Sequence, residues 1–436
     1  MRAPGAIAAL AAAIAIGAAW LVTVAHGAAA SATTAPVSTD YRQRNAAVAF
    51  YEAQVRVDPD DQITRRVLAG EYLQRFRENG DFNDVTRAIQ MARQSLRLQA
   101  YRNVGALNVL ASSDLALHRF SAALAEERAA AAAAPFDDGA RAQIASILME
   151  LGRYEQAGRI LASPRDRDPN PTWMSIRARY DELTGNLAGA RVQMAQATSL
   201  IDTSVTVPAY TRSWYHLRDA QLAFEAGDGD AAATQFAQSL HDYPANAMAL
   251  LFQAKFYRAR RDWPHALESA TRSADLYPLP QTLGYEADAQ RALGDTPAAQ
   301  RTDELIRAEQ RLFNVQGVND RLLAMYYAEH REHLDDALRA ARSDLVKRGD
   351  EIYADDTMAW VLAALNRWPQ ARNYAVRATR YETQDPELQY HAAVIAAHTG
   401  HPAEARYRLR AILSSGDVFH PFYAADARRT LAALGG

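Results

Sequence analysis

The stretches Gly152-Arg153-Tyr154-Glu155-Gln156-Ala157 and Asn366-Arg367-Trp368-Pro369-Gln370-Ala371 share one pattern: a turn, an aromatic residue and, three positions later, an alanine. The alanine of this pattern recurs along the chain, and most of the intervals are 33 to 35 residues. A recurrence at this period predicts a stacked array of small helical units rather than separate globules. The recurring alanines are Ala88, Ala123, Ala157, Ala190, Ala232, Ala266, Ala299, Ala337, Ala371 and Ala405.

A second small residue lies twelve positions before each of these alanines from Ala123 onward, and Met325 is its only exception. Two facing alanines allow two helix backbones to approach closely. The sequence therefore predicts units of two antiparallel helices joined by a short turn. The small residues of the first helices are Ala111, Ala145, Ala178, Ala220, Ala254, Ala287, Ala359 and Ala393.

Several units also end with a proline after the second helix, such as Pro135 and Pro244, because proline stops a helix. The complete pattern resembles the tetratricopeptide repeat (TPR) family, whose 34-residue unit has small residues at its eighth and twentieth positions. The resemblance covers about residues 42 to 413. It implies an all-α fold: a right-handed α-solenoid, or superhelix, of about ten antiparallel helix-turn-helix repeats.

The array has irregular places in its middle and at its end. Ile201–Thr211 lies in the longest interval and contains β-branched residues and a proline, which predicts an insertion loop. A hinge there would divide the array into residues 41–200 and 212–420. A smaller insertion near Arg311–Asn319 predicts a longer second helix. Residues 421–436 predict a capping helix with outward arginines.

The N-terminus has the order of a secretory signal peptide. One basic residue, Arg2, precedes residues 6–25, which carry no charge, and small residues follow up to Ala30. We expect residues 1–30 to be a cleaved leader, residues 31–40 a linker, and the mature protein periplasmic or secreted. The alternative is a membrane anchor, because residues 6–25 are long enough to span a bilayer. The resemblance is thus to an exported bacterial type of TPR protein.

Composition excludes several classes of chemistry. The 48 basic and 51 acidic residues give a net charge of −3, so we expect no nucleic-acid partner. The chain has no cysteine, which removes disulfides, thiol nucleophiles and cysteine-bound zinc. The sequence contains no nucleotide-binding or hydrolase motif. We predict that the protein is not an enzyme and needs no cofactor.

Short clusters of histidine and aspartate have structural explanations. His330-Arg331-Glu332-His333 and His398-Thr399-Gly400-His401 lie at predicted turns between helices, so we predict no metal site. Asp228-Gly229-Asp230 lacks the later ligands of a calcium loop and predicts a turn followed by an N-cap. Asp355-Asp356-Thr357 likewise predicts helix capping.

The resemblance also implies a binding surface. In the family, the first helix of each unit lines the concave face, and its second, fifth, ninth and twelfth positions point inward. The inward acidic residues Glu182, Asp288 and Glu329 partly cancel the charge of the inward basic residues. On this chain the predicted peptide-binding residues are Arg179, Trp214, Lys255, Arg258, Arg291, Tyr326, Trp360 and Tyr390.

A cationic middle beside an aromatic end suits an extended acidic or C-terminal peptide segment. We therefore predict a non-catalytic protein-interaction scaffold in a bacterial envelope, which binds a protein or peptide partner on its concave face. The alternatives are a structural or assembly component of a secretion or cell-surface apparatus and, third, an exported helical-toroid enzyme.

Overall fold

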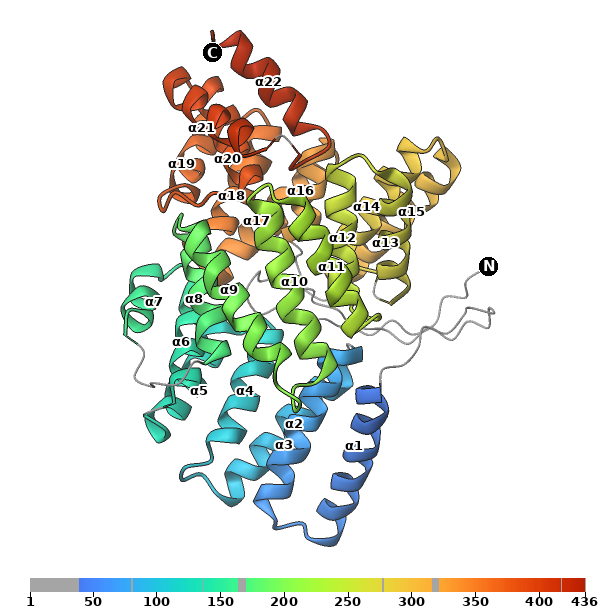
Figure 1. Ribbon diagram of the computed structural model, residues 1–436, viewed down its shortest axis with the longest axis vertical. Helices are drawn as coiled ribbons and strands as arrows, with labels where there is room; N and C mark the ends of the chain where they lie inside the picture. The colour runs from blue at the N-terminus through green and yellow to red at the C-terminus, as the bar shows by residue number, and fades with distance from the viewer. Residues whose placement is uncertain are drawn as a thin grey trace.

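The computed structural model describes residues 39–435, apart from residues 80, 136, 164–169, 277, 316–320 and 417. The predicted leader, residues 1–30, and most of the predicted linker lie outside the described residues. The described part of the chain folds into α-helices without a β-strand, and none of these helices is long and apolar enough to cross a membrane. It forms a right-handed solenoid of ten antiparallel helix pairs (Figure 1).

A lone helix, α1 (Thr39–Val57), precedes the pairs. The first five pairs are α2 (Gln62–Asn79) with α3 (Phe82–Leu98), α4 (Val104–Ala116) with α5 (Phe120–Ala133), α6 (Asp138–Glu150) with α7 (Tyr154–Leu161), α8 (Pro171–Leu183) with α9 (Leu187–Asp202), and α10 (Ala209–Glu225) with α11 (Gly229–Asp242).

The other five are α12 (Ala247–Ala259) with α13 (Trp263–Leu276), α14 (Pro280–Ala292) with α15 (Thr296–Val315), α16 (Arg321–His330) with α17 (Leu334–Arg348), α18 (Ile352–Ala364) with α19 (Trp368–Ala378), and α20 (Pro386–His398) with α21 (Pro402–Ser415). The last helix, α22 (Tyr423–Ala433), caps the array.

The repeated sequence pattern builds each pair. All ten recurring alanines are at most 1% exposed, and so are the eight alanines of the first helices. Between α6 and α7 the turn passes through Gly152 with φ +68°, a backbone conformation that favours glycine, and α7 then begins at the aromatic Tyr154. A larger side chain in place of a paired alanine would overpack the helices, at a cost of about 1–3 kcal/mol.

The irregular places are partly as expected. The connection between α9 and α10 comprises only residues 203–208, shorter than the predicted loop Ile201–Thr211, because both helices extend into it. The hinge at this connection stays a prediction. Helix α15 has 20 residues, as its insertion predicts, and the capping helix α22 has Arg428 and Arg429 exposed.

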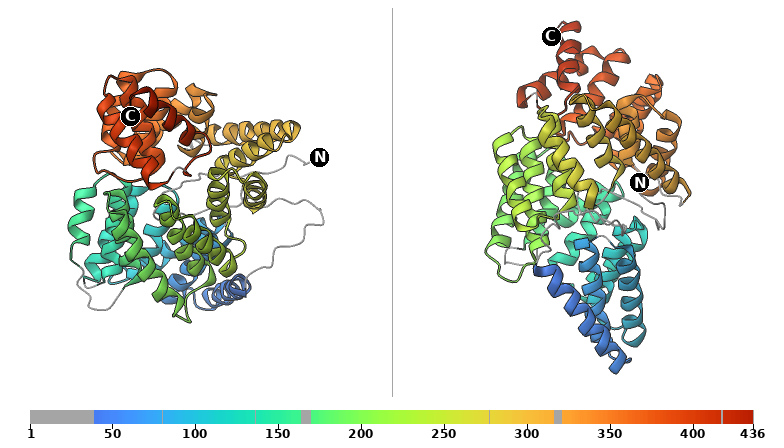
Figure 2. Two further views of the ribbon diagram at one scale, coloured as in Figure 1. Left: turned by 45° about the horizontal axis from the view of Figure 1, so that its top comes forward. Right: turned by 90° about the vertical axis from the view of Figure 1, so that its right-hand side faces the viewer.

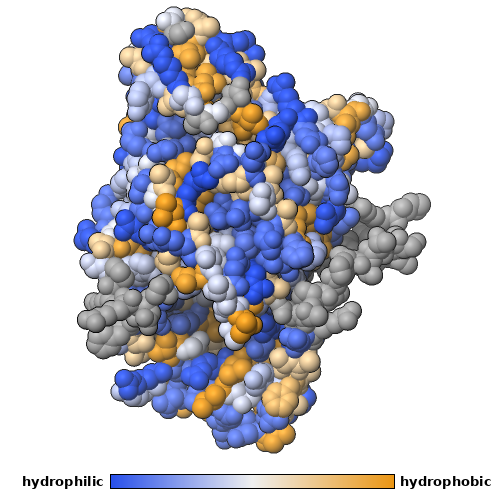
Figure 3. All heavy atoms as spheres, viewed as in Figure 1, coloured by the Kyte–Doolittle hydropathy of each residue, from blue (hydrophilic) through white to orange (hydrophobic). Residues whose placement is uncertain are grey.

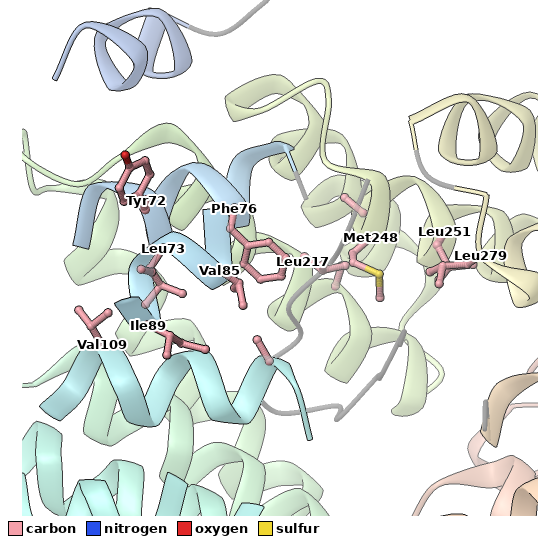
Figure 4. Packing of buried hydrophobic residues seen from close by; sticks show 14 of the residues in the cluster. Tyr72, Leu73, Phe76, Val85, Ile89, Val109, Leu217, Met248, Leu251 and Leu279 are labelled. Atoms are coloured by element: carbon pink, nitrogen blue, oxygen red, sulfur yellow. The ribbon is translucent and has the colours of Figure 1, made fainter. Parts of the chain in front are cut away.

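The superhelix is wound so tightly that distant units touch. Helices α2–α4 share a hydrophobic core with α10–α13, in which Phe76 of α2 lies near Leu217 of α10 and Met248 of α12 (Figure 4). Helices α17–α20 lie next to α6–α9 in Figures 1 and 2. There the hydroxyl of Tyr154 accepts a 3.1 Å hydrogen bond from the backbone amide of Ile352. The winding therefore brings units nearly 200 residues apart into contact.

Candidate functional site

The concave face converges on one cavity of about 60 Å³ near the middle of the molecule. Its walls come mainly from the first helices α8, α10, α12, α18 and α20, whose arrangement is visible in Figure 1. A single water molecule needs roughly 10–15 Å³ on this scale, so the cavity has room for a small chemical group. The lining residues are Glu182, Arg218, Gln221, Phe224, Glu225, Phe236, Phe252, Lys255, Tyr353, Asp385, Pro386, Glu387 and Phe419.

One side of the cavity carries acidic groups from three helices. Glu182 of α8 accepts a 2.7 Å hydrogen bond from Arg218 and a 2.6 Å bond from Arg179. The hydroxyl of Tyr353 donates to Asp385 over 3.1 Å. Oxygen Oε1 of Glu225 is buried and has no hydrogen-bond partner. Burial, together with the charges of Glu182 and Asp385, raises the pKa of Glu225 well above its usual value.

The cavity wall also holds a charge pair within the chain, next to Asp385. Nζ of Lys255 lies 3.0 Å from Oε2 of Glu387. Burial works against both charged forms, but their mutual attraction outweighs it. The attraction between the two groups raises the pKa of Lys255 and lowers the pKa of Glu387. Oxygen Oε1 of Glu387 is buried without a hydrogen-bond partner, so this pair leaves one acceptor unused.

A second charged cluster lies next to the cavity, where α12, α14, α16 and the segment before α22 meet. The guanidinium of Arg258 contacts Asp288 at 2.7 Å, Glu329 at 3.1 Å and Nε2 of His420 at 3.1 Å. His330 also binds Asp288, over 2.9 Å. Burial opposes the charged form of Glu329, but the neighbouring His420 and Arg258 lower its pKa well below its usual value. Both carboxylates of the cluster therefore share the Arg258 guanidinium as a cationic partner.

The four predicted cationic residues lie in different places relative to the cavity. Lys255 lines the cavity, and Arg179 lies behind the wall as a partner of Glu182. Arg258 is 2% exposed inside the second cluster. Arg291 lies further out, and its Nη2 contacts both carboxylate oxygens of Asp303 at 2.6 and 2.7 Å. The structure therefore gives each of these cations at least one acidic partner within the chain.

The predicted aromatic residues lie outside the cavity lining. Tyr326 is buried beside His330, with 4.2 Å between the two ring centres. Nε1 of Trp360 donates to the hydroxyl of Tyr423 over 3.2 Å, and the hydroxyl of Tyr390 donates to Asp426 over 2.7 Å. Trp214 packs on Tyr215. The contacts of Trp360 and Tyr390 join α18 and α20 to α22, and nothing in the structure tests peptide binding by any of these side chains, which remains a prediction.

Sequence reasoning missed most of the residues that make the cavity. Glu225 is the last residue of α10, and Asp385 is the N-cap of α20. Phe419 belongs to the segment that leads into α22. A single repeat contains no signal for them, because only the winding of the superhelix brings these residues together.

The structure places the histidine and aspartate clusters in helices and turns. The part of the chain that the structure describes contains no group of three or more His, Asp or Glu side chains placed to hold a metal ion, and the absence of a metal stays a prediction. Asp228 caps α11, as predicted. The capping residue of α18 is Glu351, and Asp355 lies one turn further in than predicted. Asp355 is instead buried against Arg377 at 2.7 Å, and burial raises its pKa to about 7.

A larger hollow of about 700 Å³ lies between α13, α14 and α15 on the outer side of the array. Its floor is apolar, with Leu283 and Leu305, and its rim carries Glu286, Glu304 and Arg301. The face shown in Figure 3 is mainly hydrophilic, with hydrophobic side chains scattered over it. The concave cavity differs from these surfaces because charged groups from distant units meet in it.

Comparisons with known proteins find only remote structural similarity to this chain. No family model and no curated protein matches it. Among solved structures, yeast Tom70 is similar with a TM-score of 0.35 and 11% identity, over 91% of this chain and 93% of that one. PilF of Pseudomonas aeruginosa is similar with a TM-score of 0.36 and 18% identity, over 56% of this chain and 99% of that one. The helix pairs themselves define a TPR-like α-solenoid.

Proposed function

We propose that this chain is a non-catalytic scaffold of the bacterial envelope that receives a segment of a partner protein at its concave cavity. The observation that carries the proposal is the convergence of five first helices on one cavity with acidic, basic and aromatic walls. Helical repeat arrays bind extended segments along their concave surfaces. A cavity of this size suits one side chain of such a segment rather than a whole small-molecule substrate.

The segment before α22 borders the cavity and would shape the path of a partner. Phe419 forms part of the wall, and Arg261 of the turn after α12 holds the carbonyl oxygen of Pro421 at 2.6 and 3.1 Å. Phe422 lies 5.5 Å from the guanidinium of Arg258. A partner segment would therefore enter beside residues 418–422 or displace them.

Site-specific photo-cross-linking tests this proposal. A photoreactive phenylalanine analogue replaces Phe252 in the cavity wall or, as a control, Tyr407, which is 67% exposed on α21. We expect a specific protein to cross-link at position 252 and not at position 407. Equal labelling at both positions, or no adduct at position 252, would contradict binding at the cavity.

Export is part of the proposal and has its own test. The order of charge and hydrophobicity in residues 1–30 supports it. We expect mass spectrometry of the protein from the envelope fraction to find a mature N-terminus near Ala30. An intact residue 1 in that fraction would favour the membrane anchor formed by residues 6–25.

A role as a structural component of a surface apparatus is the second candidate. Helix α1 begins the array and leaves Phe50 56% and Val57 80% exposed, which suits contact with another protein surface. A structural component would self-associate. Light scattering of the mature protein at rising concentration distinguishes the two, because a scaffold that binds a foreign segment stays at constant mass.

A further inference from the structure

The cationic residues expected to bind an acidic partner already have acidic partners within the chain. Arg258 is held between Asp288 and Glu329, and Arg179 is bound to Glu182. Asp288 and Glu329 lie on the neighbouring first helices α14 and α16, and Glu182 lies on the first helix α8. A ligand carboxylate at this face would have to displace one of these pairs. The concave face therefore has little capacity left for an anion.

The cavity does have unused capacity for a positively charged group. The cavity lining contains four carboxylates, from Glu182, Glu225, Asp385 and Glu387, and only two cationic side chains. Two of the carboxylate oxygens, Oε1 of Glu225 and Oε1 of Glu387, are buried without a hydrogen-bond partner. A buried acceptor that lacks a donor is costly, and a charged donor satisfies it best. The unused capacity of the cavity is thus for positively charged donors.

The remaining walls suit the stem of a long basic side chain. Phe224, Phe236, Phe252 and Phe419 line the same cavity. Lysine and arginine bury their aliphatic stems along apolar surface, and their charged ends interact favourably with aromatic faces. The cavity volume, about 60 Å³, matches one such end group better than several.

We propose that the cavity binds the cationic end of a lysine or arginine side chain from the partner segment, with Glu225 as its main counter-ion. This inference rests on the proposed function, because it names the chemistry of the segment that the scaffold receives. It reverses the charge expected from the inward arginines. A free amine offers the same chemistry, and we commit to the peptide source.

Binding would be linked to proton release. Glu225 faces Glu182 and Arg179 of α8, Arg218 of its own helix, Lys255 of α12, Tyr353 of α18, and Asp385 and Glu387 at the start of α20. Because the pKa of Glu225 is raised, its carboxyl group holds a proton to a higher pH than usual in the free protein. A bound cation favours the ionised form and expels that proton. Affinity would therefore rise with pH.

A peptide-display selection on the purified protein tests the proposal. We expect enriched peptides to carry lysine or arginine at one fixed position. A synthetic peptide with arginine there should lose at least about tenfold in affinity when citrulline, a neutral isostere, replaces the arginine. Glu225→Gln should cause a similar loss, whereas Glu304→Gln, in the outer hollow, should cause none. The citrulline arm leaves the protein unchanged, so it does not depend on how the variant folds.

The outcomes separate the two levels of the proposal. If peptides bind and label position 252 but show no basic preference, or if citrulline costs nothing, the cation site is wrong and the scaffold stands. If no peptide labels position 252, both fail. If free agmatine binds as tightly as the arginine peptide, the source is a small amine and the peptide assignment is overturned.

Discussion

Two of the contacts between distant units of the superhelix differ in their chemistry. Where α2–α4 meet α10–α13, the contact is a continuous apolar core around Phe76, which is fully buried. Where α6–α9 meet α17–α20, an apolar part around Ile352 and Tyr154 is joined by charged groups, hydroxyls and backbone hydrogen bonds, and we call this the polar contact. Arg348 pairs there with Glu150, and the side-chain amide of Gln384 donates to the carbonyl oxygen of Gly185 over 2.6 Å.

The difference indicates which contact contributes most to the stability of the superhelix and which one fixes how its units align. Burial of apolar surface is non-directional and depends little on pH. Buried ion pairs gain little net free energy, but they tolerate only the geometry in which every charge is matched. The apolar contact therefore mainly supplies stability, and the charged and hydrogen-bonded groups of the polar contact set the register in which Glu182, Tyr353 and Asp385 meet at the cavity.

We expect the largest loss of stability from a substitution that disrupts the apolar contact. Phe76→Ala removes a fully buried ring between α2 and α10, and we expect the free energy of unfolding to fall by about 3–5 kcal/mol. Urea denaturation followed by circular dichroism measures the change. Phe50→Ala is the matched control, because Phe50 is 56% exposed. A loss no larger than that of the control would show that this contact does not stabilise the array.

We expect the next largest loss of stability from a substitution that disrupts the polar contact. Arg348→Met leaves Glu150 and Asp344 without their cation, and we expect a loss of about 3 kcal/mol at pH 8. Burial already raises the pKa of Glu150, so this carboxyl takes up a proton readily once Arg348 is gone. An acid whose pKa is raised by folding destabilises the fold as pH rises, so the loss should shrink at pH 5.

Controls identify the pairing as the cause of that loss. The exposed pair Arg272–Glu268 should contribute at most about 1 kcal/mol, as measured with Arg272→Met. The double variant Glu150→Met with Arg348→Met should recover part of the loss, because it removes both charges. A loss that is equal at pH 5 and pH 8, with no recovery, would contradict pairing across the polar contact.

The same contrast explains what could be predicted from sequence. Ala145 and Ala157 carry a local signal, since they lie in one helix pair and are twelve positions apart, and eight of the ten units show such an alanine pair. The cavity depends on the pitch of the whole superhelix. Glu182 and Asp385 are about 200 positions apart, and no spacing within a repeat connects them. The inward direction of Lys255 could be predicted, but its pairing with Glu387 could not.

Alanine substitution of two turn glycines, one inside and one outside the polar contact, tests this contact with a smaller expected loss of stability. Gly185 has φ +83°, and a Cβ atom there would lie 2.6 Å from the carbonyl oxygen of Glu382 in the polar contact. Gly294 has φ +86° with no neighbour within 4 Å. Both alanine variants bear the cost of a left-handed conformation, about 1–2 kcal/mol. We expect Gly185→Ala to lose about 1–3 kcal/mol more in urea denaturation, because the two turns must also separate. Equal losses would mean that this contact yields without cost.

The smallest effect concerns a histidine that joins α18 to α20 beside the polar contact. Nδ1 of His391 lies 3.0 Å from both oxygens of Asp356, and the ring stacks on Trp360 at 4.2 Å. Burial opposes the charged form of His391, but the Asp356 carboxylate outweighs it and raises the pKa of the imidazole above its usual value. Further carboxylates, from Glu387 and Glu329, act in the same direction.

A group whose pKa is raised by folding stabilises the protein fully below its unfolded pKa, about 6.5 for histidine. That contribution is lost as the pH rises through the folded pKa. We therefore expect the stability advantage of the native chain over His391→Gln to be greatest near pH 6 and to decline toward alkaline pH, as measured by urea denaturation across this range. His265→Gln, at an exposed pair with Asp262, should keep the native pH dependence. If the advantage grew with pH instead, the imidazole would be neutral in the fold, and α18 and α20 would be joined by packing on Trp360 rather than by charge.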